Sequence, residues 1–553
     1  MQRYAFLATV LIAFFLVSGQ AQHSFYLEEA PEVTGQLTGY DAATDGPVTI
    51  TYSIVVPGPE FQQEKTTEVA ADGSFSLDIP YPLRRQQVWI TVAGYYFGQI
   101  LLADGLEIAF DLNKLRKRGD EFGSPHVTFS GPDGRLTTYM NQWITYEISK
   151  RKHRGLKMEV FMDREASGEE KWARLQPMYE HQAEVATQFI TDHPSPYAEL
   201  IRNELTSSMY GDALVVFRKD MPPALWEDIL QHQPLLWSND GASFLRSLAF
   251  NRRRQKPAEE LAAMEQYLPL DTDNTEEGQR LRRFIRLLRA DLNGAAVDQD
   301  QLKEERKYVY KQYEKELFQG KVDQFSSKIT VLPSAEMRDL TRMIGGEEDI
   351  WKQDIYVERV LPTMETEWLK QYLQDRWAET RAQMQEVQER LAAIKVPTVA
   401  TPLGTPAGNM QNGARLIEAA PMSIDSLLAG IRHEVGNKAI IFDIWATWCG
   451  PCLYDMKDAT GNIGKLREKD IEVVYICVAD GATVKKWKQK VAEFDLPTLH
   501  LFLTPEQSQA IMEQFNLRGY PSHLFLDEDG QYHDDVLHSI SRLDWEKLEE
   551  FGY

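Results

Sequence analysis

This chain contains few cysteines, and fewer basic than acidic residues. It holds three Cys among 553 residues, which excludes a small disulfide-stapled scaffold and means that stability rests on hydrophobic cores. Its 60 Lys and Arg stand against 83 Asp and Glu, for a formal net charge of -23. Because this excess of carboxylates repels phosphate backbones and anionic lipid, nucleic acid is not an expected partner.

Long apolar runs are missing beyond the N-terminal segment. The one candidate there covers residues 5–17, after Arg3, and small residues follow it up to Ala21. The run is shorter than the ~20 residues of a membrane-spanning helix, although a retained anchor is the alternative. Its layout is typical of a secretory signal peptide. We expect a signal peptide over residues 1–21, cleavage after Ala21 and a soluble, exported mature protein.

Residues 22–130 have the two-residue period of half-buried strands. Val48, Ile50, Tyr52 and Ile54 alternate with polar residues, and Asp-Gly pairs mark turns between strands. About seven short strands at this spacing predict an antiparallel β-sandwich. No group of acids, His or Cys converges in the sequence of this segment, so we expect a docking or structural role for it.

Residues 131–395 change to a helical period and predict an all-α middle region. Amphipathic runs cover residues 171–191, 278–293 and 303–320, with Pro and Gly between them. The last helix, over about residues 363–395, carries an a/d seam at alternating spacings of four and three residues, made of Leu373, Trp377, Thr380, Met384, Val387, Leu391 and Ile394. The seam permits a coiled-coil homodimer, or a long helix that packs within its own domain.

Residues 396–413 are rich in Pro and Gly and almost free of charge. Pro402, Gly404, Pro406 and Gly408 all fall within this segment. We expect a flexible interdomain linker there.

Residues 414–553 alternate apolar runs with helical patterns. Apolar runs cover residues 438–445, 472–479 and 498–503, and helical patterns cover residues 451–467 and 483–494. Strands buried on both faces with helices between them are typical of an α/β sheet. The predicted fold class is therefore multidomain, with a β-sandwich, an all-α region and a C-terminal α/β domain.

The first apolar run of this domain leads into Trp448-Cys449-Gly450-Pro451-Cys452 and then a helix. Two thiols separated by two residues on a first helical turn can close a small disulfide ring. The helix N-terminus presents unpaired N–H groups and partial positive charge to Cys449, so the pKa of this thiol should fall. Pro451 suits the first turn, where its missing N–H would be unpaired anyway. Cys452 lies one turn further in and suits a resolving role.

Zinc binding and a structural disulfide are the alternative uses of this pair. Zinc normally takes four ligands, but the sequence has no second CxxC or His-x-x-x-His pair, and Cys477 is the remaining cysteine. A purely structural bridge is not expected on a strand-to-helix turn. We therefore predict a redox dithiol and no metal. Cys477, in an apolar strand, is expected to be an inert core residue.

Residues 442–452 read FDIWATWCGPC and resemble the thioredoxin superfamily, in particular its exported branch related to TlpA and ResA. The resemblance covers the last quarter of the chain, the predicted thioredoxin-like domain, and includes Gly519-Tyr520-Pro521, which matches the family's cis-proline loop. It implies a cis peptide bond before Pro521 and a Tyr520 backbone that pairs with an extended substrate segment. It also implies that Trp448 lines the substrate surface.

The resemblance further implies a role for Asp443, six residues before Cys449. In thioredoxins an acid at this position takes the proton of the resolving thiol, and burial should raise its pKa. The alternative is an acid that reaches solvent at a strand end. Thioredoxins pair this acid with a Lys on the neighbouring strand, and residues 473–478 contain none. His523 could point toward the site, or be structural.

These features predict an exported thiol-disulfide oxidoreductase. Cys449 would attack a substrate disulfide, and Cys452 would resolve the mixed disulfide. The Gly-Pro dipeptide is that of thioredoxin and favours a reductase, which acts on a disulfide-containing protein, needs an inner-membrane electron donor and uses no cofactor. The two upstream regions look like those that accompany TlpA-like domains in predicted proteins of the Gram-negative periplasm, so we expect a periplasmic location.

Two alternatives from other classes are open. One is a scaffold or binding protein with a secondary redox domain. The other is a thiol peroxidase, although no Pro-x-x-x-Thr-x-x-Cys pattern precedes Cys449.

Overall fold

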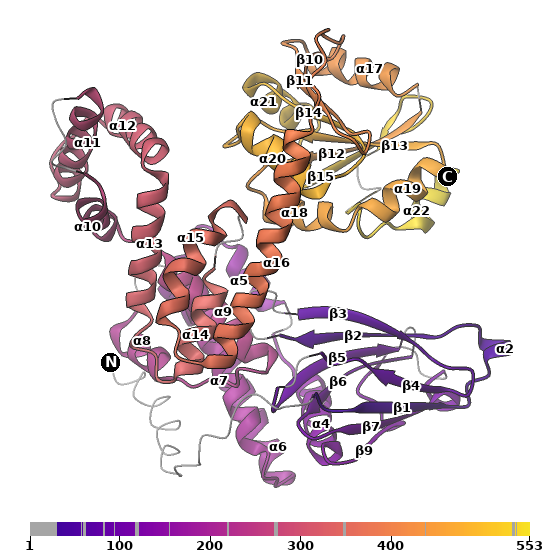
Figure 1. Cartoon of the computed structure of the whole chain (residues 1–553). Helices are drawn as coiled ribbons and strands as arrows, with labels where there is room; N and C mark the ends of the chain where they lie inside the picture. Colours follow the sequence, from indigo (N-terminus) through magenta and orange to yellow (C-terminus); the bar gives the residue numbers. More distant parts are fainter. Residues whose placement is uncertain are drawn as a thin grey trace. The chain divides into compact units, whose positions relative to one another are not determined.

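The computed structural model describes most of the chain from residue 30 onward. Not described are residues 1–29, 57, 59–61, 81–82, 93–94, 117–120, 154, 218–220, 270–274, 347–349, 437, 534–536 and 538. The predicted signal peptide therefore lies outside the described residues. Within the described part, no helix is both long and apolar enough to span a membrane. The chain divides into two compact units, Met1–Arg376 and Trp377–Tyr553 (Figure 1).

Two sheets in the first unit enclose one apolar core. The four-stranded sheet has the order β4-β1-β7-β9, and the five-stranded sheet has the order β3-β2-β5-β6-β8. Their strands are β1 (Val33–Thr38), β2 (Thr49–Val55), β3 (Gln62–Glu68), β4 (Ser74–Leu77), β5 (Gln86–Val92), β6 (Tyr96–Leu102), β7 (Leu106–Asp111), β8 (Glu121–Phe122) and β9 (Val127–Ser130). Alternate side chains of both sheets, among them Leu37, Phe110, Ile54 and Ile90, belong to a single buried cluster. This arrangement is a β-sandwich.

The sandwich is not wholly antiparallel, and the sequence prediction is wrong on this point. β1 pairs with β7 in parallel, with Val33 opposite Leu106, and β6 pairs with β8 in parallel. Two parallel strands need a connection that returns the chain to the end of the sheet where the first strand began. Strands of the other sheet lie between β1 and β7 in the chain and make this connection long enough, whereas a hairpin would be too short. Burial alternates along a strand in the same way in both pairings, so the sequence pattern does not distinguish them.

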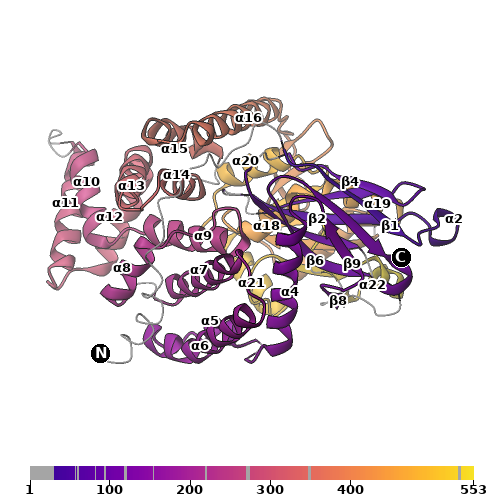
Figure 2. The ribbon, with the colours of Figure 1, turned by 90° about the horizontal axis from the view of Figure 1, so that it is seen from below.

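Helices make up the remainder of the first unit. They are α2 (Ala42–Asp45), α3 (Leu112–Leu115), α4 (Gly134–Lys150), α5 (Leu156–Met162), α6 (Gly168–Asp192), α7 (Ala198–Val216), α8 (Pro223–Gln231), α9 (Asn239–Arg253), α10 (Pro257–Tyr267), α11 (Glu276–Leu292), α12 (Gln299–Gln312), α13 (Glu314–Lys328), α14 (Ala335–Ile344), α15 (Ile350–Val360) and the 3₁₀ turn η1 (Leu361–Thr363). The predicted run over residues 303–320 is two helices, because α12 ends at Gln312 and α13 begins at Glu314, with Tyr313 as the cap between them. Helices α10 to α13 lie side by side around an apolar cluster that includes Met264, Phe284 and Val309 (Figures 1 and 2).

Helix α4 packs on strand β6 through buried polar contacts. The side chain of Asn141 accepts a hydrogen bond from the Gln99 N–H (3.2 Å) and donates one to the Gln99 carbonyl (2.7 Å). The Thr137 hydroxyl makes the same pair of contacts with the backbone of Leu101. The predicted boundary near residue 130 therefore does not separate two compact units.

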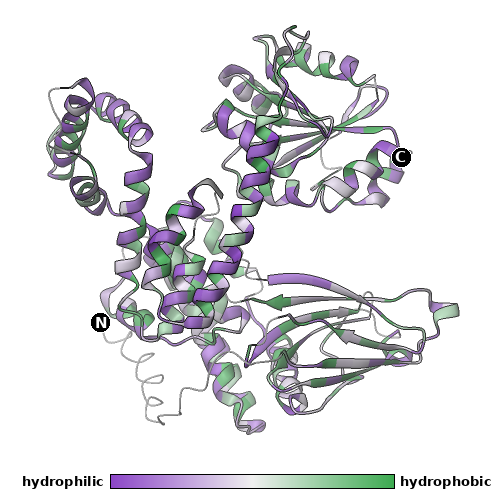
Figure 3. Cartoon of the chain, in the orientation of Figure 1, coloured by the Kyte–Doolittle hydropathy of each residue, from purple (hydrophilic) through white to green (hydrophobic). Residues whose placement is uncertain are grey.

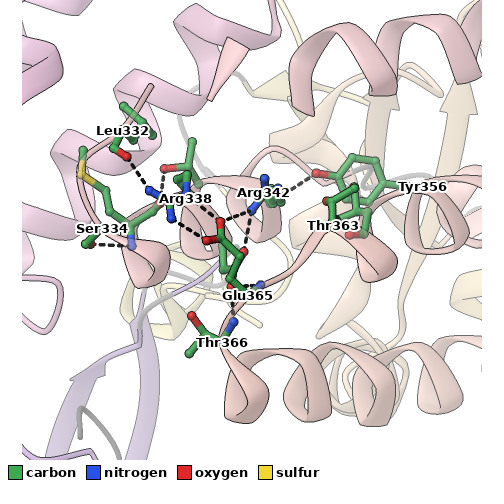
Figure 4. Close-up of polar contacts among 12 residues, drawn as sticks. Leu332, Ser334, Arg338, Arg342, Tyr356, Thr363, Glu365 and Thr366 are labelled. Atoms are coloured by element: carbon green, nitrogen blue, oxygen red, sulfur yellow. Dashed lines mark hydrogen bonds and ion pairs between the residues drawn. The ribbon is translucent and has the colours of Figure 1, made fainter. Parts of the chain in front are cut away.

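A buried ion-pair cluster holds the start of α16 (Glu367–Ala392). The Asp339 carboxylate accepts hydrogen bonds from the N–H groups of Glu365 (2.8 Å) and Thr366 (2.7 Å), and from Arg342 (2.6 Å). Arg338 donates to both oxygens of the Glu365 carboxylate (Figure 4). These contacts fix the two residues that lead into the helix.

The predicted a/d seam lies on α16. Within the chain, Leu373 is buried at one end of the seam and Val387 is buried further along it. The division between the two units falls within this helix, after Arg376. Packing inside the chain thus accounts for these two seam positions, and a homodimer through the seam stays a prediction.

A seven-stranded sheet forms the centre of the second unit, in the order β10-β11-β14-β13-β12-β15-β16. Its strands are β10 (Gly404–Asn409), β11 (Arg415–Ala419), β12 (Ala439–Trp445), β13 (Ile471–Cys477), β14 (Leu499–Phe502), β15 (Ser522–Leu526) and β16 (Tyr532–His533). The four strands from β11 to β12 are parallel, and the flanking strands are antiparallel to their neighbours. All seven residues of β12 are buried, as expected for a parallel strand covered on both faces.

Helices of the second unit alternate with these strands, as predicted. They are α17 (Ile424–Glu434), α18 (Gly450–Lys457), α19 (Thr460–Glu468), α20 (Val484–Phe494), α21 (Pro505–Gln514) and α22 (Trp545–Glu550). The helical pattern over residues 451–467 is two helices, α18 and α19. In the second unit, Figure 3 shows hydrophobic residues along the central strands and a mixture of hydrophobic and hydrophilic residues on the helices.

The flexible linker predicted over residues 396–413 is contradicted by strand β10. Residues 404–409 pair with β11 at the edge of the sheet, with Gly404 opposite Ala419. Gly404 has a φ of 151°, and a Cβ added there would lie 2.0 Å from the Glu418 carbonyl oxygen, so glycine permits the close pairing. Pro406 is tolerated because an edge strand has one side without ladder hydrogen bonds. Pro and Gly therefore mark an edge strand here.

Candidate active site

The Cys449–Cys452 pair lies where β12 leads into α18. The two cysteines form a disulfide with their Cα atoms 5.3 Å apart. Cys449 is the N-cap of α18, and its Sγ accepts a hydrogen bond from the Cys452 N–H at 3.2 Å. Cys449 is 4% exposed and Cys452 is fully buried. The first sulfur thus has the easier access to solvent and lies against an otherwise unpaired N–H of the helix.

Two aromatic side chains, Trp448 and Tyr520, contact each other near the disulfide. Trp448 is 55% exposed, and its indole donates a hydrogen bond to the Asp480 carbonyl at 2.6 Å. Its ring contacts the edge of Tyr520, with 5.8 Å between ring centroids. The peptide bond between Tyr520 and Pro521 is cis, as expected. The structure therefore brings together the predicted positions Trp448 and Tyr520, and Pro521 follows Tyr520 in the chain.

Asp443 is fully buried in the middle of β12, so the alternative of an acid that reaches solvent is wrong. It lies opposite Tyr475 of β13 and opposite His523 of β15. Its Oδ2 is 3.6 Å from His523 Nε2, and neither carboxylate oxygen accepts a hydrogen bond from the described residues. Burial raises the pKa of Asp443, and the charge of His523 offsets only part of this effect.

Asp455 completes a buried cluster of three ionisable side chains. It lies on α18, three residues after Cys452, with its Oδ2 3.5 Å from His523 Nε2. Its carboxylate accepts hydrogen bonds from the N–H groups of Ile540 (2.9 Å) and Ser541 (2.8 Å) and from a nearby Ser hydroxyl. Burial opposes the charge of Asp455, but these hydrogen bonds and His523 outweigh burial and hold its pKa below the usual range.

The His523 side chain is 2% exposed and lies between the two carboxylates. Burial alone would lower its pKa, but Asp443 and Asp455 more than offset this and raise it to about 9. His523 is therefore a cation at neutral pH.

Asp443, Asp455 and His523 have donor atoms within 4.8 Å of one another, a grouping that could hold a metal ion. Both oxygens of Asp455 are already occupied by N–H and hydroxyl donors. A protonated imidazole between the two carboxylates offsets one of their negative charges without an ion. We therefore interpret the three side chains as an ion-pair cluster.

Cys477 has the surroundings of an inert residue. It is fully buried at the end of β13, and its thiol donates to the Val478 carbonyl at 3.6 Å. Burial raises the pKa of this thiol far above its usual range, so it stays protonated and is a poor nucleophile.

Comparison with known families decides the kind of domain. Residues 432–538, which contain β12, the disulfide, α18 and the cis-proline loop, match the Redoxin family model. The C-terminal unit is a thioredoxin-like domain.

Relatives of this thioredoxin-like domain are distant in sequence. The chain is 22% identical over 115 residues to thioredoxin-like protein YneN of Bacillus subtilis (strain 168), a match that covers 21% of this chain and 65% of that protein's length. Among solved structures, a putative thiol-disulfide oxidoreductase from Bacteroides vulgatus is 27% identical, with 22% of this chain and 75% of that chain covered and a TM-score of 0.19. StoA from Bacillus subtilis is 15% identical, with 21% and 84% covered and a TM-score of 0.17.

The sequence located most of the site in the thioredoxin-like domain, but not Asp455. A signal was present, because Asp455 lies three residues after Cys452 and so on the same side of the helix. The Lys that thioredoxins place on the strand beside the buried acid is missing from β13, but another residue takes its place as the positive charge. His523 supplies the positive charge from the strand on the other side of β12.

Proposed function

We propose that this protein is an exported thiol-disulfide oxidoreductase that reduces disulfides in other proteins. The observation that carries the proposal is the Cys449–Cys452 pair at the N-terminus of α18, with exposed Trp448 and half-buried Tyr520 in contact beside it. The Redoxin match supports the same chemistry.

The reaction follows from the unequal positions of the two sulfurs. In the reduced protein, the Cys449 thiolate attacks one sulfur of a substrate disulfide, and the other substrate sulfur leaves as a thiolate. Cys452 gives its proton to the Asp443 carboxylate and attacks the Cys449 sulfur, which releases the second substrate thiolate. The substrate gains two electrons, and the protein is left as the Cys449–Cys452 disulfide.

The direction is proposed from the Gly-Pro between the cysteines. Thioredoxin, with this dipeptide, has a potential of about -270 mV, whereas the oxidant DsbA lies at about -120 mV. The signal-peptide pattern supports a periplasmic location, where a reductase needs electrons from a membrane donor.

The reduction potential of the Cys449–Cys452 disulfide directly tests whether the protein is a reductase or an oxidant. The purified full-length protein is equilibrated with glutathione buffers, and the thiol-disulfide ratio of Cys449 and Cys452 is measured. We expect a midpoint near -270 mV. A midpoint close to that of DsbA would contradict the reductase.

Substrates are identified with a trapping variant. Cys452→Ser cannot resolve the mixed disulfide, so substrate proteins should remain linked to Cys449 and be found by mass spectrometry. Cys449→Ser is the matched control and should retain none. Equal capture by both variants would favour the scaffold alternative.

A further inference from the structure

We infer that His523 is a positioning residue for the exchange reaction. It is the cationic partner that keeps the Asp443 carboxylate able to accept the proton of Cys452 and to return it. The inference rests on the proposed function and assigns a role to a residue outside the CxxC motif.

Three elements bring the relevant groups together around His523. Asp443 faces it from β12 at 3.6 Å, and Asp455 faces it from α18 at 3.5 Å. Tyr475, from β13, is a fourth titratable group, and burial together with the charges of both carboxylates raises its pKa well above the usual value. Tyr475 therefore stays neutral in the working range, which leaves the two carboxylates and the imidazole as the charges of the cluster.

Charge counting shows what His523 changes. Asp455 stays ionised because three donors bind it, so with protonated His523 the cluster has no net charge when Asp443 holds a proton. It has one net negative charge when Asp443 is ionised. Without His523 these values become one and two negative charges in a buried site. The second negative charge is much costlier there, so Asp443 would hold its proton up to higher pH.

A merely structural His does not explain this placement. Strand β13 (Ile471–Cys477) contains no basic side chain, and His523 lies directly opposite Asp443 in the β12–β15 register. His533, also in the second unit, has an ion pair of a different kind. It contacts Asp527 at 2.8 Å with both side chains partly exposed, and so provides a matched control.

The first test does not depend on activity. Imidazole Cε1 signals of the oxidised wild-type protein are titrated by NMR, with the His523 signal identified by its loss in His523→Gln. We expect a His523 midpoint near pH 9 and a fall of at least about one pH unit in Asp443→Asn, because the carboxylate charge is gone. A set of histidine signals with no midpoint above the ordinary range would overturn the inference, even if the variants failed to fold. Titration in EDTA should be the same, and a change would indicate a metal-bound cluster instead.

The second test measures the resolving step itself. Reduced protein reacts with an aromatic disulfide, and release of the second aromatic thiol reports the attack of Cys452 on Cys449. In His523→Gln the pKa of Asp443 rises, so the acid limb of the pH–rate profile should move to higher pH by about one unit and the rate below it should fall about tenfold. His533→Gln should keep the wild-type profile. Superimposed profiles of the two variants would overturn the inference.

The two tests distinguish a failure of this inference from a failure of the proposed function. Absence of any thiol release from the wild-type protein would contradict the oxidoreductase, while the NMR titration would still decide the charge state of His523. Normal exchange with an unshifted profile in His523→Gln would remove the positioning role alone.

Discussion

At the residue scale, Cys449 combines two contacts in one side chain. Its sulfur is bonded to the sulfur of Cys452 and also accepts a hydrogen bond from the Cys452 N–H in the first turn of α18. When the disulfide is reduced, the same N–H remains available to the thiolate. In the proposed reaction the Cys449 thiolate would therefore be stabilised by a group that is already in place, with little reorganisation.

Trp448 is expected to bind protein substrates through its exposed ring. Trp448→Ala should raise KM for a protein disulfide about tenfold, because the ring and its contact with Tyr520 are lost, and should leave the rate with a small aromatic disulfide nearly unchanged. Steady-state kinetics with both substrates check this. Tyr454→Ala, which removes a similarly exposed aromatic residue of α18, is the control. An equal loss with both substrates would place Trp448 in the reaction step instead.

The sequence predicted the residues that lie in one contiguous motif, and it did so because their chemistry depends on local spacing. Cys449, Cys452 and Asp443 lie within one strand-turn-helix segment. The contact of His523 with Asp455 depends instead on how β15 pairs with β12 and on where the fold places α18. Such a contact requires the tertiary fold, so no local pattern in the sequence specifies it.

At the element scale, β10 shows how composition misleads. Its Pro and Gly residues indicated a linker, but a strand at the edge of a sheet can accommodate both. The strand pattern of β12 was read correctly because complete burial leaves an uninterrupted apolar run. Helix breaks between α12 and α13, and between α18 and α19, were missed because amphipathic periodicity continues across a single capping residue or a short turn.

Gly404→Ala tests the role of β10. Its Cβ would lie 2.0 Å from the Glu418 carbonyl oxygen, so the free energy of unfolding should fall by about 2 to 4 kcal/mol. Urea unfolding followed by circular dichroism measures it. Gly461→Ala on α19 is the matched substitution, because none of the described atoms outside its neighbourhood in the helix lies within 4 Å of the added Cβ. It should leave stability unchanged or raise it by up to about 1 kcal/mol. Equal effects of the two variants would show that β10 is dispensable.

At the scale of the whole molecule, the chain has two compact units, each with many buried hydrophobic side chains. We expect two thermal transitions by calorimetry, one for each unit. The Cys449–Cys452 disulfide lies in the second unit, and in a reductase its formation is favoured by the fold. Reductant should therefore lower one transition by about 5 °C or more and leave the other in place.

The Cys449→Ser, Cys452→Ser double variant is the control for this measurement, because its transitions should not respond to reductant. A shift of both wild-type transitions would mean that the two units unfold as one.

Strand β10 also determines how the redox unit can be isolated. A fragment that begins at residue 414, where the composition suggests a natural start, would lack β10 and expose the backbone N–H and C=O groups of β11 along a free edge. Unpaired strand edges recruit strands from other molecules and cause aggregation. Poor solubility of such a fragment would therefore reflect a missing edge strand, and a fragment that begins before residue 404 avoids the problem.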